Sequence, residues 1–205
     1  MIIPGVILAG GQSRRMGGGD KGLLSLSGRR LLSHVIDRIE PQVAQLALNA
    51  NGPPERFASF GLPVLPDSAP DLSGPLAGVL TAMDWAAAMR ADVVVTVSGD
   101  TPFLPGDLVP HLLLASEGMK APLAIASSQD STGVLRLHPT CALWSVSLRE
   151  DLRQALAAGT RKMMNWADGQ GARRVAFPSA KGDPFFNINA PEDLEQAEAM
   201  IASAE

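Results

Sequence analysis

Glycines and basic side chains are interleaved in one stretch near the start of the chain, Val6 to Gly22. An apolar run, Ile2 to Leu8, leads into it and is β-branched enough to form a buried strand. The glycines let the backbone take positive φ and approach a ligand closely, because no Cβ stands in the way; they are Gly10, Gly11, Gly17, Gly18 and Gly19. Three cations share the stretch, namely Arg14, Arg15 and Lys21. Bare N–H groups and fixed positive charge after a parallel strand predict a binding site for a polyphosphate.

This loop differs from the two common nucleotide-binding loops. A Walker A loop is excluded because the chain contains no Gly-Lys dipeptide. Residues Gly17 to Gly22 match the dinucleotide pattern G-x-G-x-x-G. That pattern belongs in the tight turn directly after a strand, whereas Gly17 lies well past Leu8 and is followed by the apolar pair Leu23-Leu24. The match therefore gives no support to a dehydrogenase, and a flexible glycine loop with stray charges is the remaining alternative.

Asp100 is the acidic residue that most strongly suggests chemistry. It follows Val93 to Val97, the most strand-like run in the chain. A carboxylate at the tip of so apolar a strand is costly to desolvate unless a cation lies against it. Mg²⁺ in proteins typically takes one or two carboxylates together with substrate phosphates. Asp100 is therefore a candidate metal ligand, and the alternative is that it caps a helix beginning after Pro102.

Asn49 and Asp67 each follow the carboxyl end of another expected strand. Ligands of open parallel sheets bind outside these ends. We therefore expect the glycine-rich loop, Asn49, Asp67 and Asp100 at one edge of the sheet. Guanine presents an N1–H and a 2-amino donor, which a carboxylate such as Asp67 can accept, and Asn49 suits the base or the ribose. Both residues are also common in turns, so a purely structural role stays open.

The string LAGGQSRRMGGGDKG, Leu8 to Gly22, resembles the signature LAGG-x-S-x-RMGG-x-DK of nucleotidyltransferases with a Rossmann-like α/β fold. Within that group the chain is most similar to the molybdenum cofactor guanylyltransferases. The double glycine Gly10-Gly11 resembles the guanylyl members, whereas cytidylyl relatives often show LAAG. Further stretches fit in order along the chain: Asn49-Ala50-Asn51, Asp67-Ser68, Gly74-Pro75-Leu76-Ala77-Gly78, Asp100-Thr101-Pro102-Phe103, His138-Pro139-Thr140 and Asn187-Ile188-Asn189.

The resemblance implies a three-layer Rossmann-like α/β fold, with a mostly parallel twisted sheet flanked by helices. It implies a GTP:molybdopterin guanylyltransferase, which transfers GMP from GTP to the phosphate of Mo-molybdopterin and releases pyrophosphate. The implied cofactor is Mg²⁺, or Mn²⁺ in its place. The implied partners are GTP, Mo-molybdopterin and, transiently, cofactor-insertion proteins or apo-molybdoenzymes. Neither nucleic acid nor a membrane is expected as a partner.

Residue types and resemblance together give three sets of candidate site residues. The catalytic candidates are Arg15, Lys21 and Asp100, and Asp100 is also the metal ligand. The nucleotide-binding candidates are Leu8, Ala9, Gly10, Gly11, Lys21, Asn49, Asp67, Gly74, Gly78 and Asp100. The acceptor-binding candidates, assigned by resemblance, are His138, Arg161, Lys162, Asn187 and Asn189. Relatives often carry Arg-Arg at Arg161-Lys162, and a lysine lacks the bidentate geometry of an arginine.

The implied reaction needs charge stabilisation more than base catalysis. A phosphate monoester that attacks the α-phosphorus is already anionic, so no strong general base is required. Positioning and stabilisation of the pyrophosphate charge by Arg15, Lys21 and Mg²⁺ should dominate. Two rival functions remain: a cytidylyl- or uridylyltransferase on the same scaffold, and a non-catalytic nucleotide- or cofactor-binding chaperone.

The elements that must position these residues alternate regularly through the first half of the chain. Strands are expected at residues 2–8, 43–48, 63–65 and 93–97, and helices at 31–39, 54–59 and 76–89. This alternation demands parallel pairing with right-handed crossovers.

The second half is less regular. Helices are expected at residues 106–116, 148–158 and 162–168, and strands at 123–126, 175–177 and 185–186. Residues 133–138 and 141–144 are expected to form a strand pair broken at Pro139. A closing helix should start after Pro191, with Glu192 and Asp193 in its first turn.

Length and composition agree with one α/β domain of 205 residues. We divide it into a nucleotide-binding half, about residues 1–110, and an acceptor-binding half, about residues 111–205. Hydrophobic residues at 46% and charged residues at 19% are typical of a globular chain. The net charge of −4 gives no support to nucleic-acid binding. A single cysteine, no signal-like N-terminus and no membrane-length apolar run predict a cytoplasmic protein.

Overall fold

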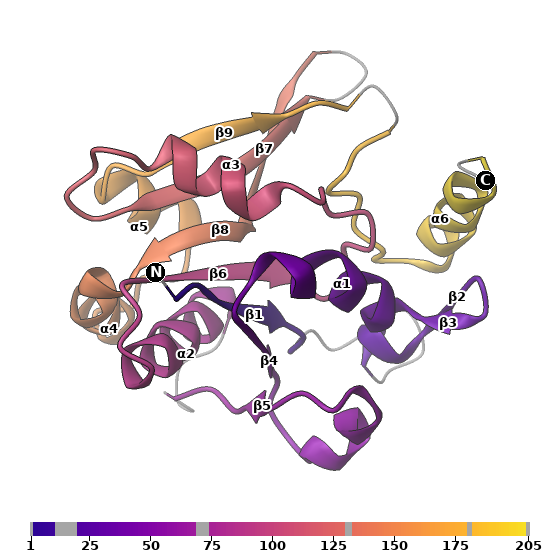
Figure 1. The fold of residues 1–205 in the computed structure, drawn as a ribbon, viewed down its shortest axis with the longest axis horizontal. Helices are drawn as coiled ribbons and strands as arrows, with labels where there is room; N and C mark the ends of the chain where they lie inside the picture. The colour runs from indigo at the N-terminus through magenta and orange to yellow at the C-terminus, as the bar shows by residue number, and fades with distance from the viewer. Residues whose placement is uncertain (1, 11–19, 69–73, 130–132, 180–181, 204–205) are drawn as a thin grey trace.

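The computed structural model describes residues 2–10, 20–68, 74–129, 133–179 and 182–203. A seven-stranded sheet with strand order β5-β4-β1-β6-β8-β7-β9 forms its centre, and a hairpin, β2-β3, stands apart from it (Figure 1). The strands are β1 (Pro4–Leu8), β2 (Ser25–Leu26), β3 (Arg29–Arg30), β4 (Gln45–Asn49), β5 (Val64–Leu65), β6 (Val93–Ser98), β7 (Leu123–Gln129), β8 (Leu135–Ser145) and β9 (Arg173–Phe177). Only β8 runs antiparallel to its neighbours in the large sheet, β6 and β7. The predicted fold class, a mostly parallel sheet flanked by helices, is confirmed.

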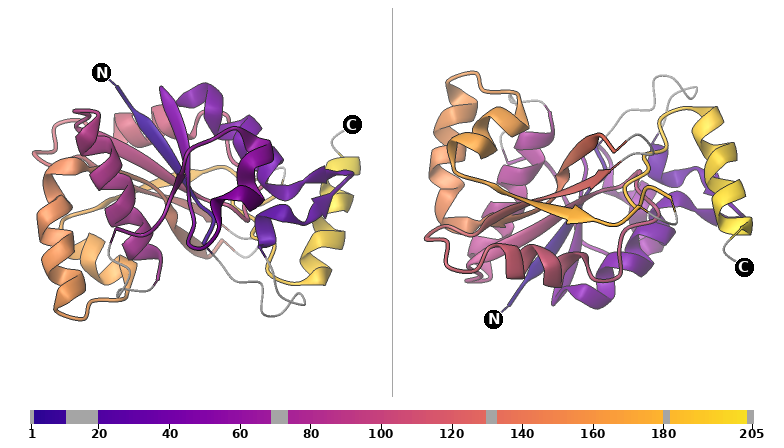
Figure 2. Two further views of the ribbon diagram at one scale, coloured as in Figure 1. Left: turned by 90° about the horizontal axis from the view of Figure 1, so that it is seen from below. Right: turned by 90° about the horizontal axis from the view of Figure 1, so that it is seen from above.

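Helices cover both faces of the sheet, giving three layers (Figure 2). The α-helices are α1 (Leu31–Ile39), α2 (Pro75–Ala88), α3 (Leu108–Ala115), α4 (Arg149–Ala157), α5 (Met163–Gly169) and α6 (Pro191–Ala202). Short 3-10 helices connect them: η2 (Lys21–Leu23), η3 (Glu40–Gln42), η4 (Pro54–Phe60) and η5 (Val146–Leu148). Helices α1 and α3 pack in one hydrophobic core, and α2, α4 and α5 pack in the core on the opposite face. The sheet is therefore buried on both faces, as its near-continuous apolar strands require.

The register of the central strands aligns their carboxyl ends. Leu8, the last residue of β1, pairs with Asn49 of β4 on one side and with Ser98 of β6 on the other. The ladder continues one step further, because Ala9 N donates to Asn49 O (2.9 Å) and Gly99 N donates to Leu8 O (3.0 Å). Parallel pairing thus puts three strand ends, with the polar side chains of Asn49 and Ser98, in one row.

Helix α6 lies away from the sheet, beside the β2-β3 hairpin (Figures 1 and 2). A small separate core joins them, built from Leu26, Leu31, Ile188 and Ala197. The Asp193 carboxylate accepts from the backbone N–H groups of Asn189 (2.7 Å) and Ala190 (2.9 Å), which satisfies donors at the start of the helix. The chain entering α6 is thereby fixed close to the end of β6, where Ile188 N donates to Asp100 O at 3.0 Å.

Three expectations about the elements are wrong or incomplete. Strand β8 is one strand that runs through Pro139, not a broken pair. Its pairing with β7 jumps from Ile125–Ala142 to Ala126–His138, so Pro139 lies at an irregularity, where its missing N–H costs no ladder bond. Residues 185–186, expected as a strand, lie at a turn. The β2-β3 hairpin was not expected; its turn residues Ser27 and Gly28 both have positive φ (48° and 75°).

The remaining expected elements are present with shifts of a few residues at their ends. Among the described residues, no helix has both the length and the apolarity needed to cross a bilayer. The single-domain organisation and its two halves stay a prediction.

Candidate active site

A cavity of about 440 Å³ opens at the carboxyl ends of β1, β4 and β6. It is lined by Leu8, Ala9, Gly10, Lys21, Gly22, Asn49, Asn51, Asp67, Gly74, Pro75, Ser98, Gly99, Asp100 and Thr140. These residues come from seven separate stretches of the sequence. Most of them meet because the parallel strands β1, β4 and β6 end at one edge of the sheet. Most of the nucleotide-binding candidates that the structure describes line this one cavity; they are Leu8, Ala9, Gly10, Lys21, Asn49, Asp67, Gly74 and Asp100.

One end of the cavity holds a pair of opposite charges. Lys21 Nζ lies 3.3 Å from Asp100 Oδ2, and both side chains are mostly buried, with 18% and 17% exposed. The same ammonium donates to Asn189 Oδ1 at 2.6 Å, which draws the loop before α6 to the cavity. The other carboxylate oxygen of Asp100 accepts from Ser98 Oγ at 2.7 Å. Asp100 is thus fixed through one oxygen, and its second oxygen faces a cation.

Asp100 is not a helix cap. Residues 101–107 contain no helix, and α3 begins only at Leu108 with Asp107 before it. The alternative weighed from the sequence is therefore wrong.

The chemistry of these donors fits a divalent cation. Mg²⁺ takes oxygen ligands and commonly completes its shell with water and substrate phosphates. Asp100 Oδ2 is an anionic oxygen that already faces positive charge. The Lys21 ammonium lies 3.3 Å from it, which is the distance of a loose ion pair. No group of three or more His, Cys, Asp or Glu side chains that could hold a metal occurs among the described residues. A cation at Asp100 would therefore draw most of its ligands from substrate and solvent.

The other end of the cavity holds a carboxylate fixed by two amides. Asp67 accepts from Asn49 Nδ2 at Oδ1 (2.9 Å) and from Asn51 Nδ2 at Oδ2 (2.7 Å). Asn49 is 5% exposed and donates also to Leu65 O (3.1 Å), so its amide is held by the sheet. A simple turn role explains neither the burial of Asn49 nor the convergence of both amides on Asp67.

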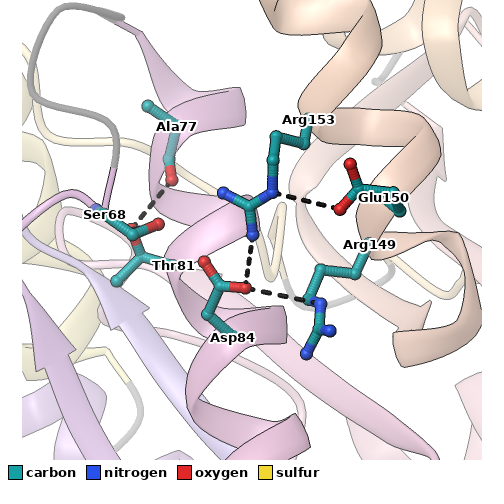
Figure 3. A network of polar contacts seen from close by, with 7 residues as sticks. All are labelled: Ser68, Ala77, Thr81, Asp84, Arg149, Glu150 and Arg153. Carbon is teal, nitrogen blue, oxygen red and sulfur yellow. Dashed lines mark hydrogen bonds and ion pairs between the residues drawn. The ribbon is translucent and has the colours of Figure 1, made fainter.

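Helix α2 supports the end of the cavity that holds Asp67. Ser68 N, next in the chain to Asp67, donates to Thr81 Oγ1 (2.9 Å), and the Thr81 hydroxyl donates to Ala77 O (3.0 Å); Figure 3 shows these contacts. Gly74 precedes the helix with φ of 108°, a conformation that favours glycine. A Cβ at Gly78, the other glycine of the predicted motif, would meet the side chains of Asn49 and Leu8. Gly78 does not line the cavity, but it leaves room for Asn49 there.

Three of the acceptor-binding candidates lie near the cavity without lining it: His138, Asn187 and Asn189, the last of which accepts a hydrogen bond from Lys21. His138 stacks on Phe185 with 4.4 Å between ring centroids, and its Nε2 is 2.7 Å from Ser128 Oγ. Burial lowers the pKa of His138 below its ordinary 6.5, Asp183 opposes this shift, and Arg136 adds to it. Asn187 Oδ1 accepts from Thr101 Oγ1 at 2.7 Å, next to Asp100.

Arg161 and Lys162 lie elsewhere. They line a separate hollow of about 590 Å³ at the turn between α4 and α5, together with Trp166 and Gln170. The Arg161 guanidinium donates to Leu156 O and Thr160 O, both at 2.9 Å. The structure therefore does not bring these two residues into the cavity of Asp100, and their acceptor-binding role stays a prediction.

Gly11 and Arg15, predicted for nucleotide binding and catalysis, lie outside the described residues, as do Arg14, Gly17, Gly18 and Gly19. Cys141, Trp144 and Trp166 are packing residues of the core. Burial raises the pKa of the Cys141 thiol to about 12, and Trp144 and Trp166 are 0% and 6% exposed.

Sequence reasoning missed three polar residues of the cavity: Asn51, Ser98 and Thr140. Asn51 and Thr140 stand in matched motifs, yet neither was given a role. Ser98 is the last residue of β6 and lies only two residues before Asp100, and this short spacing was an available signal.

Comparison with known proteins defines the class. A family model described as the MobA-like NTP transferase domain matches residues 5–174. The chain therefore belongs to the MobA-like family of nucleotidyltransferases.

Within this family the chain is similar to proteins named molybdenum cofactor guanylyltransferase. One from Cereibacter sphaeroides is 51% identical over 201 residues and covers 98% of each chain. Another, from a Bradyrhizobium species, is 47% identical, with 98% of this chain and 93% of the relative covered. Among solved structures, molybdopterin-guanine dinucleotide biosynthesis protein A from Archaeoglobus fulgidus has a TM-score of 0.74 at 25% identity, covering 98% of this chain and 99% of that one. A 4-diphosphocytidyl-2C-methyl-D-erythritol synthase from Anaerococcus prevotii shares the fold alone, with a TM-score of 0.71 at 15% identity and coverage of 98% and 96%.

Proposed function

We propose that this protein is a GTP:molybdopterin guanylyltransferase, which transfers GMP from GTP to the phosphate of Mo-molybdopterin. One observation carries the proposal furthest. A single cavity presents a lysine and a carboxylate at one end and an amide-fixed carboxylate at the other. These ends suit the phosphates and the base of one nucleotide. The identity of 51% to a relative named molybdenum cofactor guanylyltransferase supports the same assignment.

The reaction balances without an external base. An oxygen of the acceptor phosphate attacks the α-phosphorus of GTP, and the bond from that phosphorus to the bridging oxygen of pyrophosphate breaks. The electron pair leaves with pyrophosphate, and the new bond joins GMP to the cofactor. The attacking oxygen is already ionised near neutral pH, so the protein's task is to hold anions together and to stabilise the leaving group.

Lys21 is placed to stabilise that charge. Its ammonium lines the cavity and is held by Asp100 and Asn189. A bound triphosphate would offer it stronger anionic partners. Arg15 is proposed for the same task by resemblance. Asp100 would hold Mg²⁺, which would neutralise phosphate charge and orient the phosphate oxygens.

Asp67 is placed to select the base. Its two oxygens each accept one amide N–H and keep capacity to accept a second hydrogen bond. Guanine N1–H and its 2-amino group form a pair of donors that matches a carboxylate, whereas adenine presents an acceptor at N1. Asn49 orients this carboxylate from the sheet. Leu8, Ala9 and Gly10 line the same cavity, and their backbone groups would contact the nucleotide.

The acceptor side is proposed from the resemblance and from position. Asn187 and Asn189 are close to Asp100 through Thr101 and Lys21, and His138 lies on the strand that leads to Thr140. Arg161 and Lys162 would serve a more distant part of the molybdopterin.

Pyrophosphate release tests the function. The protein is incubated with Mg²⁺, Mo-molybdopterin and one of GTP, CTP, ATP or UTP. We expect release with GTP and a product heavier by GMP.

Asp100→Asn should lower the rate about 100-fold or more, in the range found when electrostatic stabilisers are removed. Asp92→Asn, at the exposed opposite end of β6, is the matched control. A preference for CTP would overturn the guanylyl assignment. Cofactor maturation that survives Asp100→Asn would favour the chaperone alternative.

A further inference from the structure

We propose that Asn51, held in place by Arg56, is a positioning residue that aims the Asp67 carboxylate at a guanine base. The inference rests on the proposed function, since it requires that Asp67 reads the base. Asn51 enters the site above only as a contact of Asp67, and Arg56 does not enter it at all. Asn51 lines the base end of the cavity, and Arg56 lies directly behind it.

Asn51 forms two hydrogen bonds with Asp67. Its side-chain Nδ2 donates to Asp67 Oδ2 at 2.7 Å, and its Oδ1 accepts from the backbone N–H of Asp67 at 2.9 Å. One bond fixes the carboxylate and the other fixes the backbone that carries it. Asn49 makes the matching bond to Asp67 Oδ1. With one amide on each oxygen, the carboxylate cannot rotate without breaking a bond, and its free lone pairs keep one direction.

Arg56 holds the segment that carries Asn51. Its Nη2 donates to Asn51 O at 2.5 Å, and its Nη1 donates to Pro53 O at 3.0 Å. Gly52 lies between these carbonyls with φ of 87°, and a Cβ there would lie 2.9 Å from Arg56 Nη1. One guanidinium thus donates to the carbonyl groups of both residues that flank Gly52.

The same guanidinium reaches the phosphate end of the cavity. Arg56 Nε lies 2.5 Å from Asp20 Oδ2, with 25% and 19% of the two side chains exposed. Asp20 directly precedes Lys21. A continuous series of contacts, Asp20–Arg56–Asn51–Asp67, therefore connects the residue beside the phosphate-binding lysine with the residue assigned to the base. Arg56 belongs to the short helix η4. The position of η4 beside the cavity therefore sets the position of this guanidinium.

The geometry sets a specific expectation for nucleotide choice. A carboxylate held at both oxygens can accept the N1–H and the 2-amino group of guanine at once. Inosine keeps the N1–H and lacks the 2-amino group, so the preference for GTP over ITP reports how well Asp67 is aimed. Loss of the Asn51 side chain frees Asp67 to rotate toward solvent. GTP binding should then weaken more than ITP binding.

The test compares the dissociation constants of GTP and ITP, measured by calorimetry with Mg²⁺ and without molybdopterin. We expect the intact protein to prefer GTP, and Asn51→Ala to reduce that preference about tenfold, the size of one charge-assisted hydrogen bond. Asn51→Ser keeps a single hydroxyl donor and should lose less. Arg56→Met should reduce the preference in the same direction. Gln45→Ala removes an exposed amide from the other end of β4 and is the matched control.

A double variant separates positioning from direct contact. In an Asp67→Ala background, Asn51→Ala should leave the remaining GTP-to-ITP ratio unchanged, because Asn51 acts through Asp67. An unchanged ratio in Asn51→Ala alone would overturn the proposal. An equal fall in both backgrounds would also overturn it, since Asn51 would then contact the base itself. An unchanged ratio in Arg56→Met would remove Arg56 from the proposal. Failure of the proposed function looks different: the intact protein would bind GTP and ITP alike, or release no pyrophosphate from GTP.

Discussion

At the scale of single residues, the cavity is organised by charges that are paired before any substrate arrives. Lys21 lies 3.3 Å from Asp100 Oδ2, and Ser98 donates a hydrogen bond to Asp100 Oδ1. A charge this poorly solvated is costly if left alone. The pairing keeps both side chains in place. When a triphosphate and its cation bind, Lys21 can pair with the phosphates and Asp100 with the cation, so neither charge is left unpaired.

Lys21→Ala tests this exchange. We expect turnover to fall about 100-fold, as it does when one stabiliser of transition-state charge is removed. The melting temperature should fall only modestly, because Asp100 loses its cation in a mostly buried position but keeps the hydrogen bond from Ser98. The measurements are pyrophosphate release and thermal unfolding by circular dichroism. Lys120→Ala, at an exposed position after α3, is the control for loss of a lysine. A variant that melts much earlier and turns over normally once folded would show that Lys21 is structural.

The residues that sequence reasoning identified and those it missed differ in a physical way. Lys21 was identified because it is a cation within a glycine-rich loop, and Asp100 because it is a carboxylate after an apolar strand. Ser98 and Asn51 are neutral and common in loops, and only their contacts with Asp100 and Asp67 give them a role. Such contacts depend on side-chain placement across sequence separations that no local pattern records.

At the scale of elements, helix α2 joins the cavity to the rest of its layer. Its first turn borders the cavity, Thr81 supports Ser68, and Asp84 lies between Arg149 and Arg153 of α4 (Figure 3). Because the same helix packs on the sheet through its apolar side chains, any shift of α2 would move Gly74 and Asp67 together.

Asp84→Asn tests the contact between α2 and α4. Arg153 Nη2 lies 2.8 Å from Asp84 Oδ1, and Arg149 Nε lies 3.5 Å from it. We expect the free energy of unfolding to fall by about 1 kcal/mol, the upper end for partly exposed ion pairs. Urea denaturation measures it. Glu150→Gln removes only the more exposed 3.3 Å contact with Arg153 and should cost less. A larger loss for Glu150→Gln than for Asp84→Asn would contradict this view of the interface.

Strand β8 supplies a pH-dependent contact through His138. Burial lowers the pKa of His138 below 6.5, Asp183 opposes the shift, and Arg136 reinforces it. The unfolded chain therefore binds a proton more readily than the folded one, and the free energy of unfolding should fall as pH drops below about 6.5 toward the lowered value. Above that pH the neutral imidazole imposes no such loss. His138→Gln should flatten this part of the stability profile, measured by denaturation between pH 8 and 5. A profile that is equally steep in the variant would assign the pH dependence to other groups.

Helices and strands that are determined by a pattern within a few neighbouring residues were predicted more closely than those that depend on distant contacts. Helices α1 and α2 and strand β6 carry their pattern within a few residues, and their positions were expected closely. Strand β8 was wrongly divided because Pro139 is tolerated only at the irregularity opposite Ile125 and Ala126. The hairpin at Ser27-Gly28 was missed because its strands have two residues each, too few for a periodic pattern.

At the scale of the whole molecule, the site depends on residues far apart in the sequence. Lys21, Asp100 and Asn189 meet although 168 positions separate the first from the last. The meeting of the first two at one sheet edge follows from parallel topology and was predicted. The position of Asn189 depends on a small core in which Ala197 of α6 and Ile188 pack with Leu26 of the hairpin and Leu31 of α1. No rule for strands and helices supplies this tertiary contact.

A ligand that contacts all of these parts should stabilise the whole fold. GTP with Mg²⁺ at about 100 times its dissociation constant would add about 2.7 kcal/mol to the free energy of unfolding. For a chain of this size we expect a rise in melting temperature of about 5–10 °C. ATP at the same concentration shares the phosphates and lacks the guanine donors, so its shift should be smaller. Lys21→Ala should reduce the shift with both nucleotides, and Asp67→Ala should reduce it with GTP alone. Equal shifts for GTP and ATP in the intact protein would contradict base selection by Asp67, while no shift with either would contradict nucleotide binding at this cavity.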